Sequence, residues 1–104
     1  MNKPLVFATV FLLVVGVSSA SAGGDASAGK TKSATCAGCH GMDGNSANPD
    51  WPNLAGQGAA YIEKQLQAFK AGERQNATMA PMAATLGEQD MADLAAFYAA
   101  QTAK

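Results

Sequence analysis

The residues with the most distinctive chemistry form one short motif, Cys-Ala-Gly-Cys-His, at positions 36–40. Both cysteines of the chain, Cys36 and Cys39, and its one histidine, His40, lie within it. Two thiols separated by two residues and followed by an imidazole are the attachment pattern for haem c. The thiols add to the vinyl groups of haem, and the imidazole coordinates the iron. The motif therefore predicts one covalent haem c, with Cys36 and Cys39 holding the porphyrin and His40 the iron.

Other interpretations of the motif explain fewer of its residues. A thioredoxin-like redox centre normally follows a strand in a βαβ unit, and no strand pattern lies near this motif. A structural zinc site needs four ligands, and the motif provides only three. A disulfide between the two cysteines would close a very small loop, add little stability and leave the histidine unexplained.

The first 22 residues predict a secretory signal peptide. Lys3 gives a basic start, residues 5–17 form an apolar run, and Ala20-Ser21-Ala22 is a cleavage site of small residues. As a helix, that run would reach only about 20 Å, whereas the hydrocarbon core of a membrane is about 30 Å thick. We therefore expect cleavage after Ala22, export to the periplasm, and one soluble domain at residues 23–104 without stable membrane insertion.

The composition indicates a small, mildly acidic domain. The chain has 104 residues and a net charge of −1, which does not favour binding to nucleic acid or to anionic membranes. A mildly acidic carrier would prefer protein partners with a basic docking patch. Domains of this size often cannot bury enough apolar surface to fold stably without a cross-link or a cofactor, and a covalent porphyrin would supply both. We therefore expect the apoprotein to be largely unfolded.

The residue pattern predicts an all-α fold with long loops. Helices are expected at 26–35, at 58–72, and from residue 85 or 87 towards the C-terminus. The turn-rich segment 41–53 is expected to be a loop that wraps around the cofactor. Residues 73–85 are expected to be irregular because Pro81 is incompatible with a helix interior.

The other axial ligand of the iron is expected among the methionines, because no second histidine exists. A less usual ligand, or none, is the alternative. Met91 lies on the apolar face of the last helix and is expected in the core. Met42 follows His40 by only two residues, too few to reach the opposite face of the haem. Met79 and Met82 remain, and residue types alone do not choose between them.

Several motifs together resemble the class I c-type cytochromes. The resemblance is strongest to small bacterial monohaem cytochromes of the c-553 type and to single halves of dihaem cytochromes c, and it covers residues 25–101. It is carried by Cys-Ala-Gly-Cys-His-Gly, Asp-Gly-Asn, Pro-Asn-Leu-Ala-Gly-Gln-Gly, the methionine segment and Leu-Ala-Ala-Phe-Tyr, at residues 36–41, 43–45, 52–58, 76–82 and 94–98. It implies the class I cytochrome c fold, with three main helices and loops around one haem.

The resemblance also implies roles for individual residues. The carbonyl of Pro52 would accept a hydrogen bond from the second nitrogen of His40 and so orient the ring. Leu54 would pack on the porphyrin, and Arg74 would lie near a haem propionate. The spacing to the last helix favours Met79 over Met82 as the sixth ligand.

Two further positions match the family where its first and last helices cross. Gly29 corresponds to the glycine of that crossing and Phe97 to its aromatic residue, so the two helices are expected to approach closely there.

A haem iron with both axial positions filled implies a one-electron carrier rather than an enzyme. A methionine ligand favours ferrous iron and raises the potential. Donor and acceptor proteins would dock where one haem edge stays exposed, with an expected rim of Ala37, Gly38, Ala55 and Met82. Two alternatives remain open: the electron-accepting subunit of an enzyme complex, and a haem sensor or peroxidase-like protein with a labile distal ligand.

Overall fold

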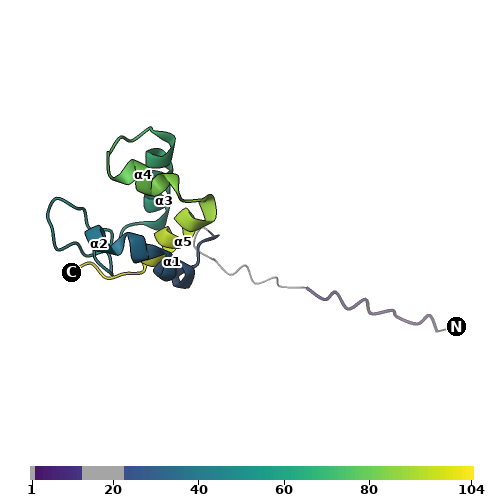
Figure 1. Cartoon of the computed structure of the whole chain (residues 1–104). Coiled ribbons are helices and arrows are strands. Elements are labelled where there is room, and N and C mark those ends of the chain that lie inside the picture. The colour runs from purple at the N-terminus through teal and green to yellow at the C-terminus, as the bar shows by residue number, and fades with distance from the viewer. Residues whose placement is uncertain (1, 13–22) are drawn as a thin grey trace.

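The computed structural model describes residues 2–12 and 23–104 of the chain (Figure 1). Within these ranges every regular element is a helix, which confirms the all-α prediction. The elements are α1 (Ala26–Lys32), the 3₁₀ turn η2 (Ser33–Thr35), α2 (Ala37–His40), α3 (Ala59–Ala71), α4 (Met79–Ala84) and α5 (Glu88–Ala99). Helix α5 packs against both α1 and α3, and α3 also packs against α4.

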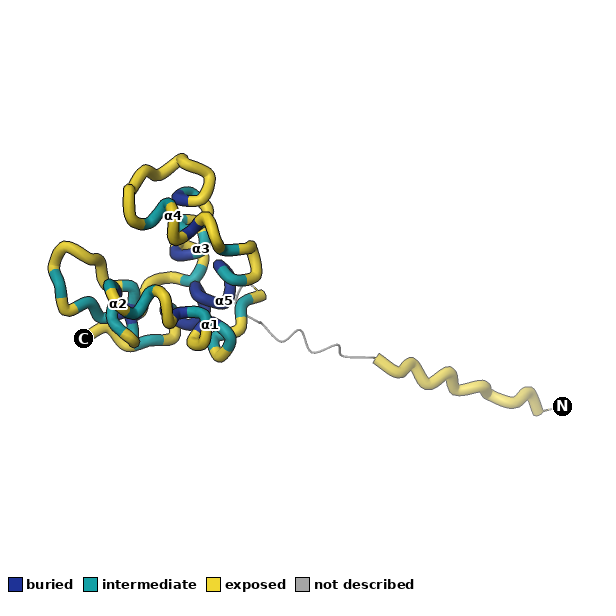
Figure 2. Tube along the Cα trace, viewed as in Figure 1, coloured by how far each residue is buried: buried dark blue, intermediate teal, exposed yellow. Residues whose placement is uncertain are grey.

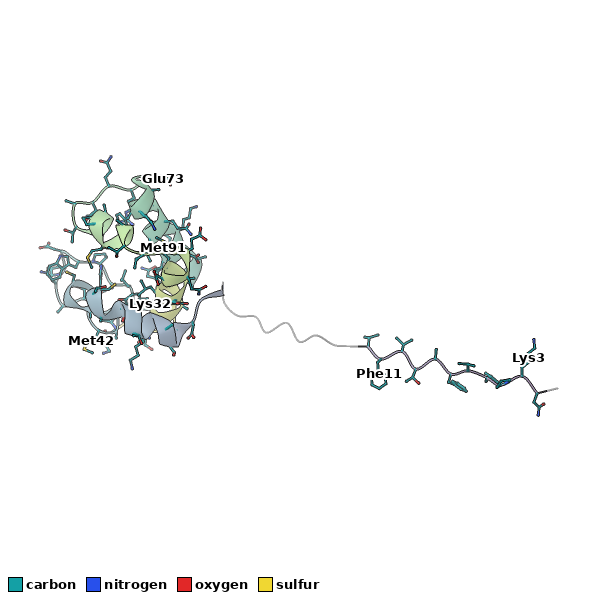
Figure 3. The ribbon with its side chains drawn as sticks, turned by 45° about the vertical axis from the view of Figure 1, so that its right-hand side comes forward. Lys3, Phe11, Lys32, Met42, Glu73 and Met91 are labelled. Atoms are coloured by element: carbon teal, nitrogen blue, oxygen red, sulfur yellow. The ribbon has the colours of Figure 1, made fainter. Side chains whose placement is uncertain are left out.

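The N-terminal segment contributes no element to this fold. Residues 2–12 form neither helix nor strand, and their large apolar side chains, including Phe11, are exposed (Figure 3). The expected cleavage site after Ala22 and the second part of the apolar run lie outside the described residues. Among the described helices, none is long and apolar enough to cross a membrane.

Helix α1 begins at a side-chain cap and crosses α5 at a glycine. The carboxylate of Asp25 accepts hydrogen bonds from the backbone N–H groups of Ser27 and Ala28, as expected of an N-cap residue. A Cβ atom on Gly29 would lie 2.0 Å from the carbonyl oxygen of Asp93 and 2.8 Å from Cβ of Phe97. Only glycine allows this approach, so the expected crossing of Gly29 and Phe97 is confirmed.

Helix α5 forms the centre of the core. All residues from Met91 to Tyr98 are buried, and Figure 2 shows the buried segment between α1 and α3. Ile62 of α3 joins Leu94, Ala95, Phe97 and Tyr98 in the main apolar cluster. Met91 is only 2 % exposed, which confirms its predicted place in the core.

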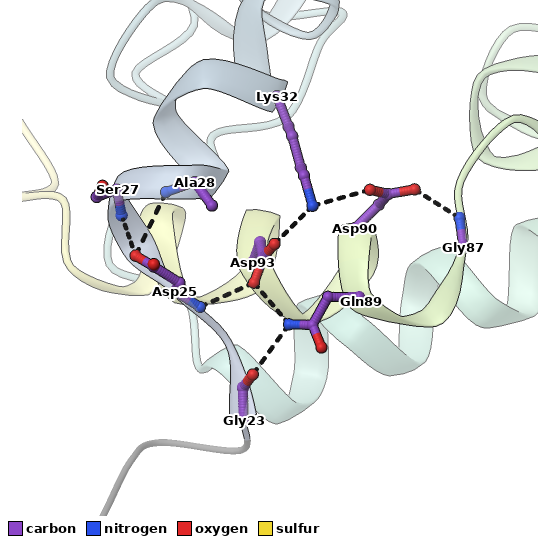
Figure 4. A network of polar contacts seen from close by, with 9 residues as sticks. All are labelled: Gly23, Asp25, Ser27, Ala28, Lys32, Gly87, Gln89, Asp90 and Asp93. Carbon is purple, nitrogen blue, oxygen red and sulfur yellow. Dashed lines mark hydrogen bonds and ion pairs between the residues drawn. The ribbon is translucent and has the colours of Figure 1, made fainter.

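A buried carboxylate joins α1, α5 and the start of the domain (Figure 4). Asp93 is 3 % exposed, and it accepts hydrogen bonds from Nζ of Lys32 at 2.6 Å, the N–H of Asp25 at 2.9 Å and Nε2 of Gln89 at 2.8 Å. These donors, Lys32 first, lower the pKa of Asp93 to about 2. Lys32 also pairs with Asp90 at 2.9 Å. We call these five residues the Asp93 network.

The prediction for residues 73–85 was partly wrong. This segment contains the short helix α4, and Pro81 is its third residue. Proline is compatible with the first turn of a helix because the N–H groups there have no partner within the helix. The segment 26–35, predicted to be one helix, forms two elements: α1 ends at Lys32, and the 3₁₀ turn η2 follows it. The loop at 41–53 contains no helix or strand, as predicted.

Candidate haem site

Helix α2 is a single turn that carries the cysteine–histidine motif. Cys36 directly precedes it, and both Cys39 and His40 lie within it. Residues three apart on a helix lie on the same side, so the turn brings the two thiols to one face. Both cysteines are half-buried and neither forms a disulfide, so the two thiols remain available for attachment.

The ring of His40 is buried and held by one hydrogen bond. Its Nδ1 atom lies 2.8 Å from the carbonyl oxygen of Pro52, and the residue is 7 % exposed. A carbonyl oxygen can only accept, so Nδ1 must donate its proton. The neutral ring therefore carries its lone pair on Nε2, the form in which imidazole binds a metal.

The segment that presents Pro52 is anchored by Gly44. The carbonyl of Gly44 accepts hydrogen bonds from the N–H groups of Leu54 at 2.7 Å and Ala55 at 3.0 Å. Gly44 has a φ of +81°, and a Cβ atom there would lie 2.8 Å from both the Ala55 nitrogen and Cδ1 of Tyr98. Glycine is thus required for the loop to approach α5 and to hold Pro52 beside His40.

Two cavities of about 250 and 260 Å³ lie around this histidine. Both are lined by Cys36, His40, Pro52, Asn76 and Met79. The first continues between α3 and α5, where the apolar side chains of Ile62, Leu66, Phe69 and Leu94 line it. The second is lined by Cys39, Trp51 and Met82 among others. Apolar walls with two thiols and a metal-binding imidazole fit an apolar, iron-containing macrocycle such as haem.

The structure brings together the residues that the sequence predicted for the site. Besides the shared residues, Leu54 and Arg74 line the first cavity, and Cys39 and Met82 line the second. Met42 is 84 % exposed and points away from the helices (Figure 3), so it lies outside the site as predicted.

The guanidinium of Arg74 is held at the cavity from two sides. It lies 4.5 Å from the centre of the Phe69 ring, and its Nη1 atom donates to Oε1 of Gln65 at 2.8 Å. The charge is therefore positioned by cation–π contact and by a neutral amide rather than by a carboxylate.

Sequence reasoning missed two features of the site and misplaced one residue. The Oδ1 atom of Asn76 accepts from the N–H groups of Thr78 at 2.9 Å and Met79 at 2.8 Å, which holds the backbone at the start of α4. The Asn-Ala-Thr-Met spacing, an Asx residue three positions before the helix, could have indicated this. Tyr98 lines the first cavity, although the sequence placed it only on an apolar face. Ala55 is 6 % exposed, so the prediction that it forms the exposed rim was wrong; its N–H is bonded to Gly44 beneath the surface.

Comparison with known proteins identifies the family. The profile of the family "Cytochrome c" matches residues 26–100. The chain belongs to the cytochrome c family. Its cofactor is therefore haem c, bound covalently, and its helical structure is a cytochrome c fold.

Three relatives define its position in the family. Cytochrome c4 of Pseudomonas aeruginosa is 46% identical over 101 residues, which cover 97% of this chain and 49% of that protein. Cytochrome c-554(548) of Halomonas halodenitrificans is 47% identical over 81 residues, covering 75% of this chain and 98% of that protein. The crystal structure of reduced recombinant cytochrome c4 from Pseudomonas stutzeri aligns with a TM-score of 0.75 at 44% identity, covering 78% of this chain and 47% of the other. This cytochrome c chain thus spans about half the length of the cytochrome c4 proteins that it matches.

Proposed function

We propose that this cytochrome c is a periplasmic one-electron carrier whose haem iron is ligated by His40 and Met79. The observation that carries the proposal is the hydrogen bond of 2.8 Å from Nδ1 of His40 to the Pro52 carbonyl, which leaves Nε2 as the metal-binding atom beside the two cavities. When bound, haem c supplies a ferric/ferrous couple. The protein's task is then to hold the two axial side chains and to exclude water.

The ring of His40 is held in place by its surroundings. Burial of the ring and the bond to Pro52 hold the imidazole in one tautomer and one orientation. A hydrogen bond from the other ring nitrogen to a carbonyl also increases the basicity of a ligating imidazole. His40 would thus be held ready to bind the iron of haem in one fixed orientation.

Met79 is better placed than Met82 to be the second axial ligand. Met79 lines both cavities, whereas Met82 lines only the second and is 38 % exposed. The backbone of Met79 is also held by Asn76, because its N–H donates to the Asn76 side chain at 2.8 Å. A thioether ligand favours ferrous iron and raises the reduction potential.

The remaining residues shape the pocket. Leu54 lines the first cavity and would pack on the porphyrin face, keeping water from it. Arg74 lines the same cavity with a charge that lacks a carboxylate partner among the described residues, which supports a role beside a haem propionate. An ion pair there would hold the propionate in its charged form.

Electron transfer is favoured over ligand sensing or peroxidase-like chemistry because His40 and Met79 both line the two cavities, so that each could supply one axial ligand. An iron with both sites filled has no open position for a substrate or gas. Its donor and acceptor are other redox proteins, which would dock on the exposed side near Gly38 and Met82. Rapid binding of carbon monoxide to the reduced protein would instead favour a sensor.

The proposal places the mature domain at residues 23–104, outside the cytoplasm. It is supported by the basic start, the apolar run and the small residues up to Ala22. Intact-mass measurement of the exported protein tests this, since the product should begin at Gly23 and carry one haem. Purification of the exported protein also distinguishes a free carrier from an enzyme subunit, because a subunit would co-purify with its dehydrogenase.

The test of the axial ligands is a pair of variants. Met79→Ala should remove the iron–sulfur charge-transfer absorbance of the ferric protein. It should also lower the midpoint potential by on the order of 0.1 V, a fraction of the range that axial ligands span. Met82→Ala is the matched control and should keep both properties. If Met82→Ala loses the absorbance and Met79→Ala keeps it, the ligand assignment is wrong, although the carrier function would stand.

A further inference from the structure

Tyr98 carries a buried hydroxyl group for which the described part of the chain offers no partner. The residue is 2 % exposed, and its Oη atom forms no hydrogen bond in the structure. Its ring is fixed on both sides: it packs edge-on against Phe97, with 5.0 Å between ring centres, and the loop at Gly44 lies directly against it. The hydroxyl therefore cannot turn out to solvent to find a partner.

A buried O–H without an acceptor is unfavourable, and nearly all such groups in proteins are paired. Burial raises the pKa of the Tyr98 hydroxyl well above its usual range, so the group is a proton donor. Cys36 and Ser33 are polar side chains beside it. The hydroxyl of Ser33 donates to the carbonyl of Lys30 at 2.7 Å and forms no hydrogen bond with the Tyr98 hydroxyl. Cys36 is the residue that haem attachment changes chemically.

We infer that Tyr98 donates its hydroxyl hydrogen to the thioether sulfur that forms at Cys36, and that this bond raises the reduction potential of the haem. The inference rests on the haem attachment of the proposed function. A free thiol is both a weak donor and a weak acceptor, whereas a thioether sulfur has lost its hydrogen and can only accept. Attachment therefore leaves a sulfur that can interact with the buried hydroxyl only as an acceptor.

The position of Tyr98 favours this sulfur over a haem propionate as the acceptor. The oxygen is covered by protein atoms, and Cys36 packs against the apolar cluster that contains Tyr98. Arg74, the charged residue of the first cavity, comes from the turn after α3 and not from α5. The hydroxyl thus approaches the macrocycle at its attachment through Cys36.

The electrostatic effect of this bond on the reduction potential has a predictable direction. The positive end of the O–H dipole points at a sulfur bonded to the porphyrin, in surroundings of low dielectric where such dipoles act strongly. A positive potential favours the electron-rich ferrous state. Removing the hydroxyl should lower the equilibrium constant for reduction about threefold, which is about 28 mV for a one-electron couple at 59 mV per tenfold.

The test compares Tyr98→Phe with Tyr61→Phe in the haem-loaded protein. Tyr61 is the other tyrosine of the chain and lines the same cavity, but it is 55 % exposed, so its hydroxyl can bond to water. Tyr98→Phe should lower the midpoint potential by the stated amount at every pH between 5 and 9. Tyr61→Phe also changes the lining of the cavity, but its hydroxyl has water as a partner, so its shift should be clearly smaller than that of Tyr98→Phe. An equal potential in Tyr98→Phe and the wild type, or equal shifts in the two variants, overturns the inference.

Two further readouts separate this inference from its competitors. If the hydroxyl bonds to a propionate, the Tyr98→Phe shift should vary with pH as the propionate titrates, and this result also overturns the thioether assignment. In the wild-type protein, proton NMR should show a slowly exchanging Tyr98 hydroxyl with a nuclear Overhauser contact to the Cys36 methylene. A hydroxyl in fast exchange with water contradicts the bond even if the variant does not fold. Wild-type protein without covalent haem would contradict the proposed function itself.

Discussion

The two sides of α5 differ in how their buried polar groups are satisfied. On the side of α1, the carboxylate of Asp93 accepts from Lys32, Gln89 and the Asp25 backbone, and the ion pair continues to Asp90 (Figure 4). On the side of the cavities, less than two helical turns away, the Tyr98 hydroxyl has no partner among the described residues. Helix α5 therefore has one side on which protein groups satisfy a buried polar side chain. On its other side the buried hydroxyl of Tyr98 has no protein partner in the described part of the chain.

The difference indicates which part of the fold we expect to depend on haem. At the α1 crossing, Gly29 lets two backbones approach, and the Asp93 network pairs Lys32 with both Asp90 and Asp93. Around the cavities, apolar side chains from α3 and α5 line an open space, and the hydrogen bond at Nδ1 of His40 leaves Nε2 as the nitrogen that can bind a metal. We therefore expect haem to fill the space on the cavity side of α5, where it would supply the contacts that the Asp93 network supplies at the α1 crossing.

The largest effect should come from removing the haem attachment. In the variant Cys36→Ala, Cys39→Ala, we expect the loss of most helical signal in far-ultraviolet circular dichroism. Without the porphyrin, a domain of this size buries too little apolar surface. The control is the haem-loaded wild type under the same conditions. Native helicity in the variant would mean that the α1 crossing alone supports the fold, and the comparison between the two interfaces would fail.

A smaller but still large effect is expected from Gly29→Ala. The new methyl group would lie 2.0 Å from the Asp93 carbonyl oxygen, so α1 and α5 must separate. Such overpacking typically reduces the free energy of unfolding by roughly 1–3 kcal/mol. Denaturant titration of the haem-loaded protein measures it.

The matched control for that change is Gly38→Ala. A Cβ atom on Gly38, which is also helical, would meet nothing within 4 Å. Its stability should stay near that of the wild type, and the absorbance of the haem should be unchanged in both variants. An equally stable Gly29→Ala protein would show that the crossing is not closely packed in solution.

The sequence predicted those parts of the site whose chemistry needs particular residue types. Covalent attachment requires thiols and an imidazole at fixed spacing, so Cys36, Cys39 and His40 were readable directly. Pro52 was different, because a carbonyl acceptor can come from any residue. Only the resemblance to the class I cytochromes suggested it, and the distance of 2.8 Å to His40 agrees.

The features that the sequence did not predict depend on distant contacts. Asp93 and Asp25 are 68 residues apart, so nothing in the local pattern shows that they meet. Ala55 looked exposed within a loop, but Gly44 draws that loop against Tyr98 and buries it. Pro81 is incompatible with a helix interior, but α4 is so short that this third residue still lies in its first turn.

The smallest predicted effect concerns the Asp93 network in acid. In the folded protein the pKa of Asp93 is about 2, whereas an unfolded Asp titrates near 3.9. A lowered folded pKa contributes stability that is complete above the unfolded value and declines as the pH falls towards 2. The melting temperature of the wild-type protein should therefore fall between about pH 4 and pH 2 as Asp93 is protonated.

Neutralising single carboxylates isolates this contribution. Asp93→Asn should melt several degrees below the wild type at pH 7, because Lys32 then loses its buried partner, and the difference should shrink towards pH 2. Glu73→Gln is the control: Glu73 is exposed, points away from the helices (Figure 3), and has no ion pair among the described residues. It should keep the wild-type acid profile. The Asp93 network lies away from the cavities. At pH 7, Asp93→Asn should therefore shift the midpoint potential from the wild-type value by less than Tyr98→Phe does. A larger shift would mean that the two sides of α5 are not independent.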